Sequence, residues 1–132
     1  MNITYRQDVT PDTDAIIAVY ESSGINRPTQ DKERISKMYA HANVVVTAWK
    51  NELLVGVARS ITDYCYCCYL SDLAVRSEYQ NAGIGKKLIA LTKDVIGDEC
   101  MLLLVAAPSA ANYYPKIGMD RVSDAFIIKR KL

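Results

Sequence analysis

The sequence lacks a long apolar run, which argues against a membrane-spanning helix. Such a helix needs about 18 or more consecutive apolar residues, and no run of that length occurs among the 132 residues. The first residues, 1–6, also lack the basic region and the apolar run that together make a secretory signal. We therefore expect a cytoplasmic protein without a membrane partner.

An excess of charge of either sign is also missing. Lys and Arg together number 16 and Asp and Glu 15, so the formal net charge is +1. A protein that holds nucleic acid through the field of its whole surface is usually more basic. We expect no nucleic-acid partner, and we interpret the terminal run 129–131 as a solvated tail.

Typical metal ligands are few, because the chain has one histidine, His41, and four cysteines. Cys65, Cys67 and Cys68 lie close together in sequence. Successive side chains of a strand point to opposite faces, so these three thiolates would not converge on one ion. We predict no metal site and interpret the cysteines as reduced thiols.

The chain has no linker rich in Pro or Gly and no internal repeat, so residues 1–132 are predicted to form a single domain. The hydrophobic pattern favours a mixed α/β (α+β) sheet in the order βααβββαβαβ(β), with antiparallel early strands and a central parallel pair. The run 101–106 is interpreted as the buried central strand. Strands are predicted over 2–6, 44–49, 53–60, 66–75, 101–106 and 121–130. Helices are predicted after the capping residues Thr10 and Thr29, over 83–96, and weakly over 109–117.

The most informative segment is Leu73–Leu88, with the sequence LAVRSEYQNAGIGKKL. A strand ends, a polar loop follows, and two glycines precede an amphipathic helix. Glycines permit a tight turn, and the free N–H groups at a helix start bind anions such as phosphate. A dinucleotide fingerprint would need glycine at position 88, and a P-loop would need glycine at position 80 and Ser or Thr at position 87. The segment meets neither requirement.

The remaining pattern, Q-x-x-G-x-G after a strand that ends in Leu-Ala-Val, resembles the pyrophosphate-binding motif of the GNAT acetyltransferase superfamily. The later segment Tyr113–Met119, with the sequence YYPKIGM, resembles the family's F-Y-x-x-x-G-F segment. The order of elements resembles the GNAT fold over nearly the whole chain. The alternative interpretation of Gly83 is an ordinary helix start that binds no ligand.

The resemblance implies acetyl-CoA as a co-substrate. The backbone N–H groups of 81–85 would hold its pyrophosphate, with Lys86 close by, and β-strand groups at 73–75 would hold its pantetheine arm. The family often has Asn at position 107, where this chain has Ala, and Asn112 is a candidate replacement. The implied cofactor-binding residues are Leu73, Ala74, Val75, Gln80, Asn81, Ala82, Gly83, Ile84, Gly85, Lys86 and Asn112.

The family mechanism implies direct attack by an amine in a ternary complex. Tyr114 would be the general acid for the leaving thiolate, because a phenol holds its proton at neutral pH. The alternative is a packed aromatic ring, and Pro115 could interrupt the helix and move the phenol. Asp72 is the candidate general base, with ordered water or a purely structural aspartate as alternatives.

The acceptor is expected to be a primary amine, either on a small molecule or exposed on a protein. Its groove would lie between the first helices and the last strands, where the segment from Asp120 onward could form a brief hairpin. Candidate wall residues are Tyr66, Tyr69, Arg27 and Phe126, with Tyr20 and Asn26 as weaker candidates. The rival hypothesis is a non-catalytic acyl-CoA-binding sensor. A homodimer is possible, because dimers are common in the family.

Overall fold

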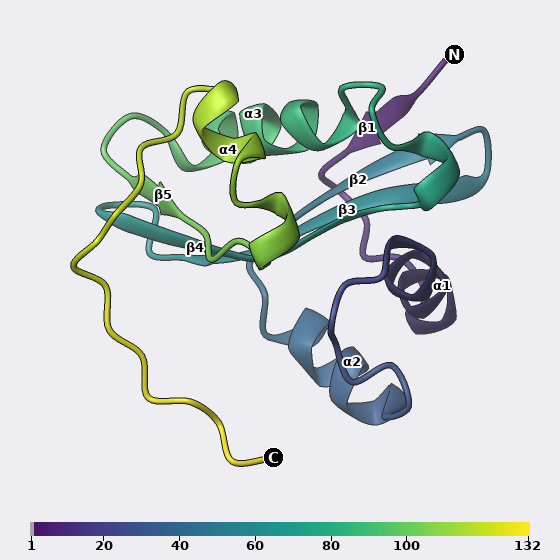
Figure 1. Ribbon diagram of the computed structural model, residues 1–132. Coiled ribbons are helices and arrows are strands. Elements are labelled where there is room, and N and C mark those ends of the chain that lie inside the picture. Colours follow the sequence, from purple (N-terminus) through teal and green to yellow (C-terminus); the bar gives the residue numbers. More distant parts are fainter. Residues whose placement is uncertain (1) are drawn as a thin grey trace.

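In the computed structural model, which describes residues 2–132, a central sheet separates two sets of helices (Figure 1). Over that range the sheet has five strands in the order β1-β2-β3-β4-β5. These are β1 (Thr4–Arg6), β2 (Val44–Lys50), β3 (Leu53–Thr62), β4 (Cys67–Val75) and β5 (Met101–Leu103). The first four strands are antiparallel, and β5 runs parallel to β4. The predicted mixed sheet is confirmed, although its parallel pair lies at one edge.

Two helices cover one face of the sheet and a third covers the other (Figure 1). Those on the first face are α1 (Thr13–Ser23) and α2 (Lys32–Ala40), and the opposite face carries α3 (Ile84–Ile96). The short helices are η1 (Ser77–Tyr79), η2 (Pro108–Ala110) and α4 (Tyr113–Lys116). Within residues 2–132, no helix has both the length and the apolar character to cross a bilayer.

The helix caps differ in part from the predictions. Asp31 rather than Thr29 precedes α2, and its carboxylate accepts a hydrogen bond of 3.0 Å from the backbone N–H of Arg34. Asp12 rather than Thr10 precedes α1. Both Asp and Thr suit this position, so the local pattern identifies a helix start but not which of two neighbouring candidates caps it. Gly24 ends α1, as predicted.

The apolar core lies in two layers, one on each face of the sheet. Leu88 of α3 packs against β2 and β3, while Ile16 of α1 and Ile35 of α2 pack against the opposite face. All three side chains are fully buried. Burial of each such side chain contributes about 1.5–3 kcal/mol of stability, so these layers hold the helices firmly against the sheet.

Two predictions for the C-terminal third are wrong. The predicted central strand 101–106 is reduced to β5, which lies at the sheet edge and leaves the side chain of Met101 56% exposed. The predicted strand 121–130 has no secondary structure, and every residue of it is exposed. An apolar run indicates a strand that needs a partner, but the sequence does not say where that partner lies.

Close approach of α3 to the sheet depends on Gly56 in β3. A methyl group at this position would lie 3.2 Å from Leu88 Cδ1 and 3.3 Å from Ile84 Cγ2. We predict that Gly56→Ala lowers the free energy of unfolding by about 1–3 kcal/mol, as overpacking of a core does. Chemical denaturation monitored by circular dichroism measures this change, and an unaltered unfolding midpoint would contradict the close packing.

Candidate functional site

Strands β4 and β5 separate soon after their pairing begins. Cys67–Tyr69 lies beside Met101–Leu103, and β4 then continues to Val75 with pairing to β3 alone among the described residues. A strand edge without a neighbour presents free backbone N–H and C=O groups. The second half of β4 therefore offers an open edge to a bound molecule, next to the gap between the two strands (Figure 1).

A bulge in β4 marks the start of this open edge. Arg59 of β3 pairs with Asp72 and the next residue, Ser60, pairs with Leu70, so Ser71 is an extra residue in β4. The Ser71 carbonyl is not left without a partner, because it accepts a hydrogen bond of 2.7 Å from Nη2 of Arg27. The loop between α1 and α2 is thereby tied to the bulge.

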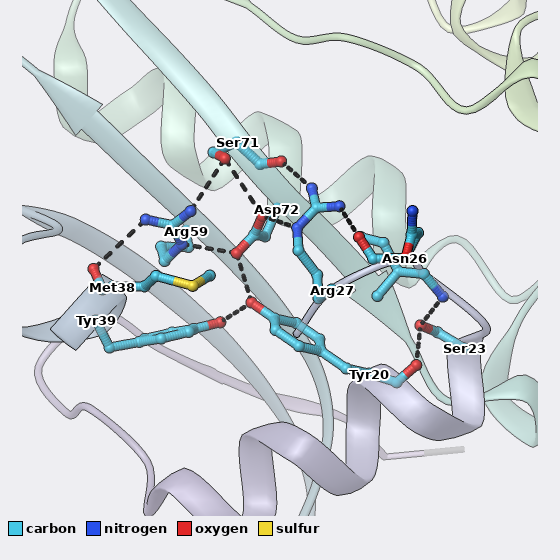
Figure 2. Close-up of polar contacts among 10 residues, drawn as sticks. Tyr20, Ser23, Asn26, Arg27, Met38, Tyr39, Arg59, Ser71 and Asp72 are labelled. Carbon is cyan, nitrogen blue, oxygen red and sulfur yellow. Dashed lines mark hydrogen bonds and ion pairs between the residues drawn. The ribbon is translucent and has the colours of Figure 1, made fainter. Parts of the chain in front are cut away.

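Asp72 lies at the centre of a buried polar network (Figure 2). Its side chain has no exposed surface. Nε of Arg27 donates to Oδ1 at 2.5 Å, Nε of Arg59 donates to Oδ2 at 2.7 Å, and the Tyr20 hydroxyl donates to Oδ2 at 2.6 Å. The hydroxyl of Tyr39 lies 2.6 Å from that of Tyr20 and donates to it, since the Tyr20 proton is committed to Asp72. One carboxylate thus joins α1, α2, the intervening loop and the sheet.

The network fixes the charge state of Asp72. Burial alone would raise the pKa of this carboxyl, but hydrogen bonds from Arg59 and Tyr20 and the charges of Arg59 and Arg27 bring it below the ordinary value. Burial, together with the neighbouring Tyr39 and Asp72, raises the pKa of Tyr20. Asp72 therefore stays ionised and Tyr20 stays protonated. Both side chains are fully buried, whereas Arg27 keeps 26% of its side chain exposed.

The start of α3 has the features of an anion site. Gly83 adopts a left-handed conformation with φ of 81°, no other group lies within 4 Å of where a Cβ would be, and the first turn has no acidic residue. Lys86 is exposed in that turn. The first N–H groups of a helix have no partner within it, and the helix dipole favours an anion there.

The loop before α3 is tied to the end of β4. The side-chain amide of Gln80 donates a hydrogen bond of 2.9 Å to the carbonyl of Val75. Asn81 has a positive φ of 62°. This contact ties the loop before α3 to the end of β4, so the predicted residues 73–75 and 80–86 lie near one another, although the side chains of Ala74, Val75 and Ile84 are buried.

Two tyrosines of α4 lie in contact with each other near this surface. The ring centroids of Tyr113 and Tyr114 are 5.2 Å apart, with an interplanar angle of 76°. A Cβ on Gly85 would lie 3.8 Å from the Tyr113 hydroxyl, so this phenol, which the sequence reasoning did not single out, reaches the start of α3. Burial and the neighbouring Tyr113 raise the pKa of Tyr114, which is half-buried. Pro115 does not delay the helix, which begins at Tyr113, because the first turn needs no N–H donor at that position.

The remaining predicted residues are dispersed. Tyr69 lies on β4 at 42% exposure, and Tyr66 lies in the turn before β4 at 77% exposure. Asn112 precedes α4, and its Oδ1 accepts a hydrogen bond of 3.1 Å from Nη2 of Arg121. Phe126 is 97% exposed in the extended C-terminal segment, which forms no hairpin, so the structure does not bring it to the other candidates.

Other sequence predictions concern metal ligands. Among residues 2–132, no group of three or more His, Cys, Asp or Glu side chains is placed to hold an ion. All four cysteines are free thiols. His41 is exposed at the end of α2.

The Asp72 network gives a prediction for stability. Asp72→Asn should lower the free energy of unfolding by about 3–5 kcal/mol, because it leaves the buried guanidinium group of Arg59 and the partly buried one of Arg27 with a neutral partner. Because folding lowers the pKa of Asp72, its contribution is present above pH ~4 and is lost as the pH falls further. Denaturant unfolding of both proteins across this range tests this prediction.

Asp8→Asn is the matched control, because Asp8 also pairs with an arginine, Arg6, but both side chains are exposed. This change should have little effect. Two results would contradict the assigned role of the network. One is an equal loss of unfolding free energy in the two variants, and the other is an unchanged pH dependence of that free energy in Asp72→Asn.

Comparisons with known proteins connect this geometry with a family. The profile of the acetyltransferase (GNAT) domain matches residues 41–118. A curated relative, the uncharacterized N-acetyltransferase ycf52 of Gracilaria tenuistipitata var. liui, is 26% identical over 97 residues, which cover 71% of this chain and 53% of the relative. The chain thus spans about half the length of the curated relative it matches.

Solved structures show the same fold. Protein SA2161 of meticillin-resistant Staphylococcus aureus, of unknown function, superposes with a TM-score of 0.82 at 22% identity, covering 98% of this chain and 100% of that one. The GNAT family acetyltransferase SP0256 of Streptococcus pneumoniae gives a TM-score of 0.73 at 20% identity, covering 98% and 100%. The aminoglycoside N-acetyltransferase AAC(6')-Iy in complex with CoA gives 0.73 at 12% identity, covering 99% and 96%. With the matched domain profile extending from the end of α2 through α4, the chain belongs to the GNAT acetyltransferase family.

Proposed function

We propose that this protein transfers an acetyl group from acetyl-CoA to the nitrogen of a primary amine. The observation that carries the proposal is the start of α3, where Gly83 opens a helix terminus beside the free edge of β4. Acetyl transfer is the general activity of the family, and the acceptor and the roles of individual residues are the new part of the proposal.

The residues at the start of α3 fit a pyrophosphate. The site needs several N–H donors, space for a bulky anion and no competing carboxylate, and the first turn of α3 meets all three requirements. Asn81, Ala82, Gly83, Ile84 and Gly85 would direct backbone N–H groups at the phosphates, and Lys86 would add a positive charge. The structurally similar AAC(6')-Iy has been solved with CoA and with a bisubstrate analogue, which supports this assignment.

The open edge of β4 suits the pantetheine arm of the same molecule. Leu73, Ala74 and Val75 would offer backbone groups there, and Gln80 would hold the end of the strand in place through its bond to Val75. When bound, acetyl-CoA supplies the activated thioester. A backbone N–H that donates to the thioester carbonyl would stabilise the negative charge that develops on this oxygen as the amine attacks.

Tyr114 would donate the proton that the leaving thiolate requires. Its raised pKa keeps the phenol protonated at neutral pH. The amine would attack directly, so no covalent intermediate forms on the protein. A non-catalytic sensor would need the cofactor surface but not this proton donor.

We propose a positioning role for Asp72 in place of the general base. Both of its oxygens accept hydrogen bonds, two of its partners are guanidinium groups, and its pKa is lowered. These contacts favour a role in which the Asp72 carboxylate holds Arg27 and the bulge in place, rather than one in which it accepts a proton. Ordered water would then carry the proton from the amine. Arg27 and Tyr69 remain candidate walls for the acceptor, with the more exposed Tyr66 beside them.

A substitution at Gly83 tests cofactor binding. Gly83→Glu should abolish binding of acetyl-CoA in calorimetry. The new side chain would occupy the position of the phosphates, and its negative charge would repel them. Gly24→Glu is the matched control, since Gly24 has nearly the same backbone angles (φ 79°, ψ 9° against 81°, 6°) and equally open surroundings. Loss of binding in both variants, or no binding by the unaltered protein, would overturn the proposal.

A substitution at Tyr114 tests turnover. Tyr114→Phe should lower kcat by about 10²–10⁴-fold while the Kd for acetyl-CoA stays nearly constant, as expected when a general acid is removed. Release of CoA is followed with a panel of amines and amine-bearing peptides. Tyr113→Phe removes the neighbouring hydroxyl and should change kcat far less. Equal effects of the two changes would contradict the role of Tyr114, and cofactor binding without any turnover across the panel would favour the sensor.

A further inference from the structure

The buried network around Asp72 carries more positive than negative charge. Its ionised groups are the carboxylate of Asp72 and the guanidinium groups of Arg27 and Arg59, which pair with it at 2.5 Å and 2.7 Å. Burial raises the pKa of Tyr20 and of Tyr39, so both phenols are neutral. In the part of the chain that the structure describes, no other carboxylate pairs with either guanidinium. One positive charge of the network is therefore left without a negative partner.

Arg27 is the member of this network that a ligand can reach. Its side chain is 26% exposed, whereas that of Arg59 is 8% exposed. Nε of Arg27 donates to Asp72. Nη1 and Nη2 donate to the carbonyls of Asn26 and Ser71, each at 2.7 Å. A guanidinium has five N–H groups, so one N–H on each Nη has no partner among the described residues.

The two remaining N–H groups share one edge of the Arg27 guanidinium. In Figure 2, the carbonyls of Ser71 and Asn26 approach the guanidinium from opposite sides, and the edge between Nη1 and Nη2 has no partner. Two parallel N–H groups on a planar cation match the two oxygens of a carboxylate. The charge and the shape of this edge both favour a carboxylate as its ligand.

This edge lies where an acceptor, rather than the cofactor, would bind. The bond to the Ser71 carbonyl places Arg27 at the bulge of β4. The segment proposed for the pantetheine arm begins at Leu73, two residues or about 7 Å further along the strand. The phosphates of the cofactor are assigned to the other end of that segment, at the start of α3. An anion bound to Arg27 would therefore belong to the acceptor and lie only a few bonds from its reacting nitrogen.

We infer that the acceptor is a primary amine that also carries a carboxylate, and that Arg27 binds this carboxylate through its open edge. The inference rests on the proposed acetyl transfer and names the class of amine that takes part in it. The carboxylate would supply the negative charge that the network lacks. A neutral amine of the same size would leave both N–H groups of that edge without a charged partner and would bind more weakly.

Release of CoA with matched pairs of acceptors tests the inference. Each pair is an amino acid and its amide, in a series from glycine through β-alanine and 4-aminobutyrate to 5-aminopentanoate. For at least one spacing, kcat/KM for the acid should exceed that for the amide by about 10–100-fold, as expected for hydrogen bonds between charged groups. The carboxylate raises the pKa of the nearby amine. This intrinsic effect favours the amide, so a preference for the acid must come from the protein.

Arg27→Gln should remove this preference, and Arg6→Gln is the matched control. Arg6 also pairs with a carboxylate, that of Asp8, but both side chains are exposed and lie outside the network. Its loss should leave the acid-to-amide ratio of kcat/KM unchanged. A purely structural Arg27 would affect acid and amide equally, so the ratio separates the two roles. Arg27→Lys is a second variant that keeps the charge but not the two-pronged edge, and it should lower the ratio less than Arg27→Gln. Circular dichroism checks that every variant is folded.

The outcomes distinguish this inference from the proposed function. Acetylation of amides as fast as acids at every spacing would overturn the inference and leave acetyl transfer intact. The same holds if Arg27→Gln keeps the ratio of the unaltered protein, or if Arg6→Gln lowers the ratio equally. No turnover of any amine would contradict the proposed function and the inference together.

Discussion

The buried carboxylate of Asp72 is the interaction on which the arrangement of the candidate site depends. It receives hydrogen bonds from α1, from the α1–α2 loop and from β3, at the bulge where β4 becomes free of β5. Burial of a carboxylate without hydrogen-bond partners costs much free energy, so the fold is stable only when each partner of Asp72 stays in place. Arg27 in turn satisfies the Ser71 carbonyl, which fixes the loop against the sheet at the point where the gap opens.

Local contacts link the open edge of β4 and the start of α3, where we propose that the cofactor binds. The bond from Gln80 to the Val75 carbonyl links the two, and Gly56 allows Ile84 and Leu88 of α3 to lie close to β3. If the cofactor binds there as proposed, a site whose parts are already linked lowers the entropic cost of binding. Tyr113 and Tyr114 lie near it because α4 follows β5 directly through η2.

How far the sequence predicts the structure depends on the range of the contacts involved. The helix start at Gly83 is set by neighbouring residues, and the sequence predicted it. The partners of Asp72 come from distant elements, so its charge state was not readable from its own strand. Which of Tyr113 and Tyr114 reaches Gly85 depends on the orientation of α4. The predicted strand over 121–130 is absent, because an apolar pattern favours a strand but does not supply the neighbouring strand that it needs.

The most direct test of the account is a titration of the ¹⁵N-labelled protein with acetyl-CoA, followed through its amide resonances. The account predicts that the largest shifts occur at the N–H groups of 81–86 and 73–75, with much smaller shifts along β1 and β2. Saturable shifts that centre elsewhere, or no shifts at all, would contradict the claim that the start of α3 and the open edge of β4 bind the cofactor.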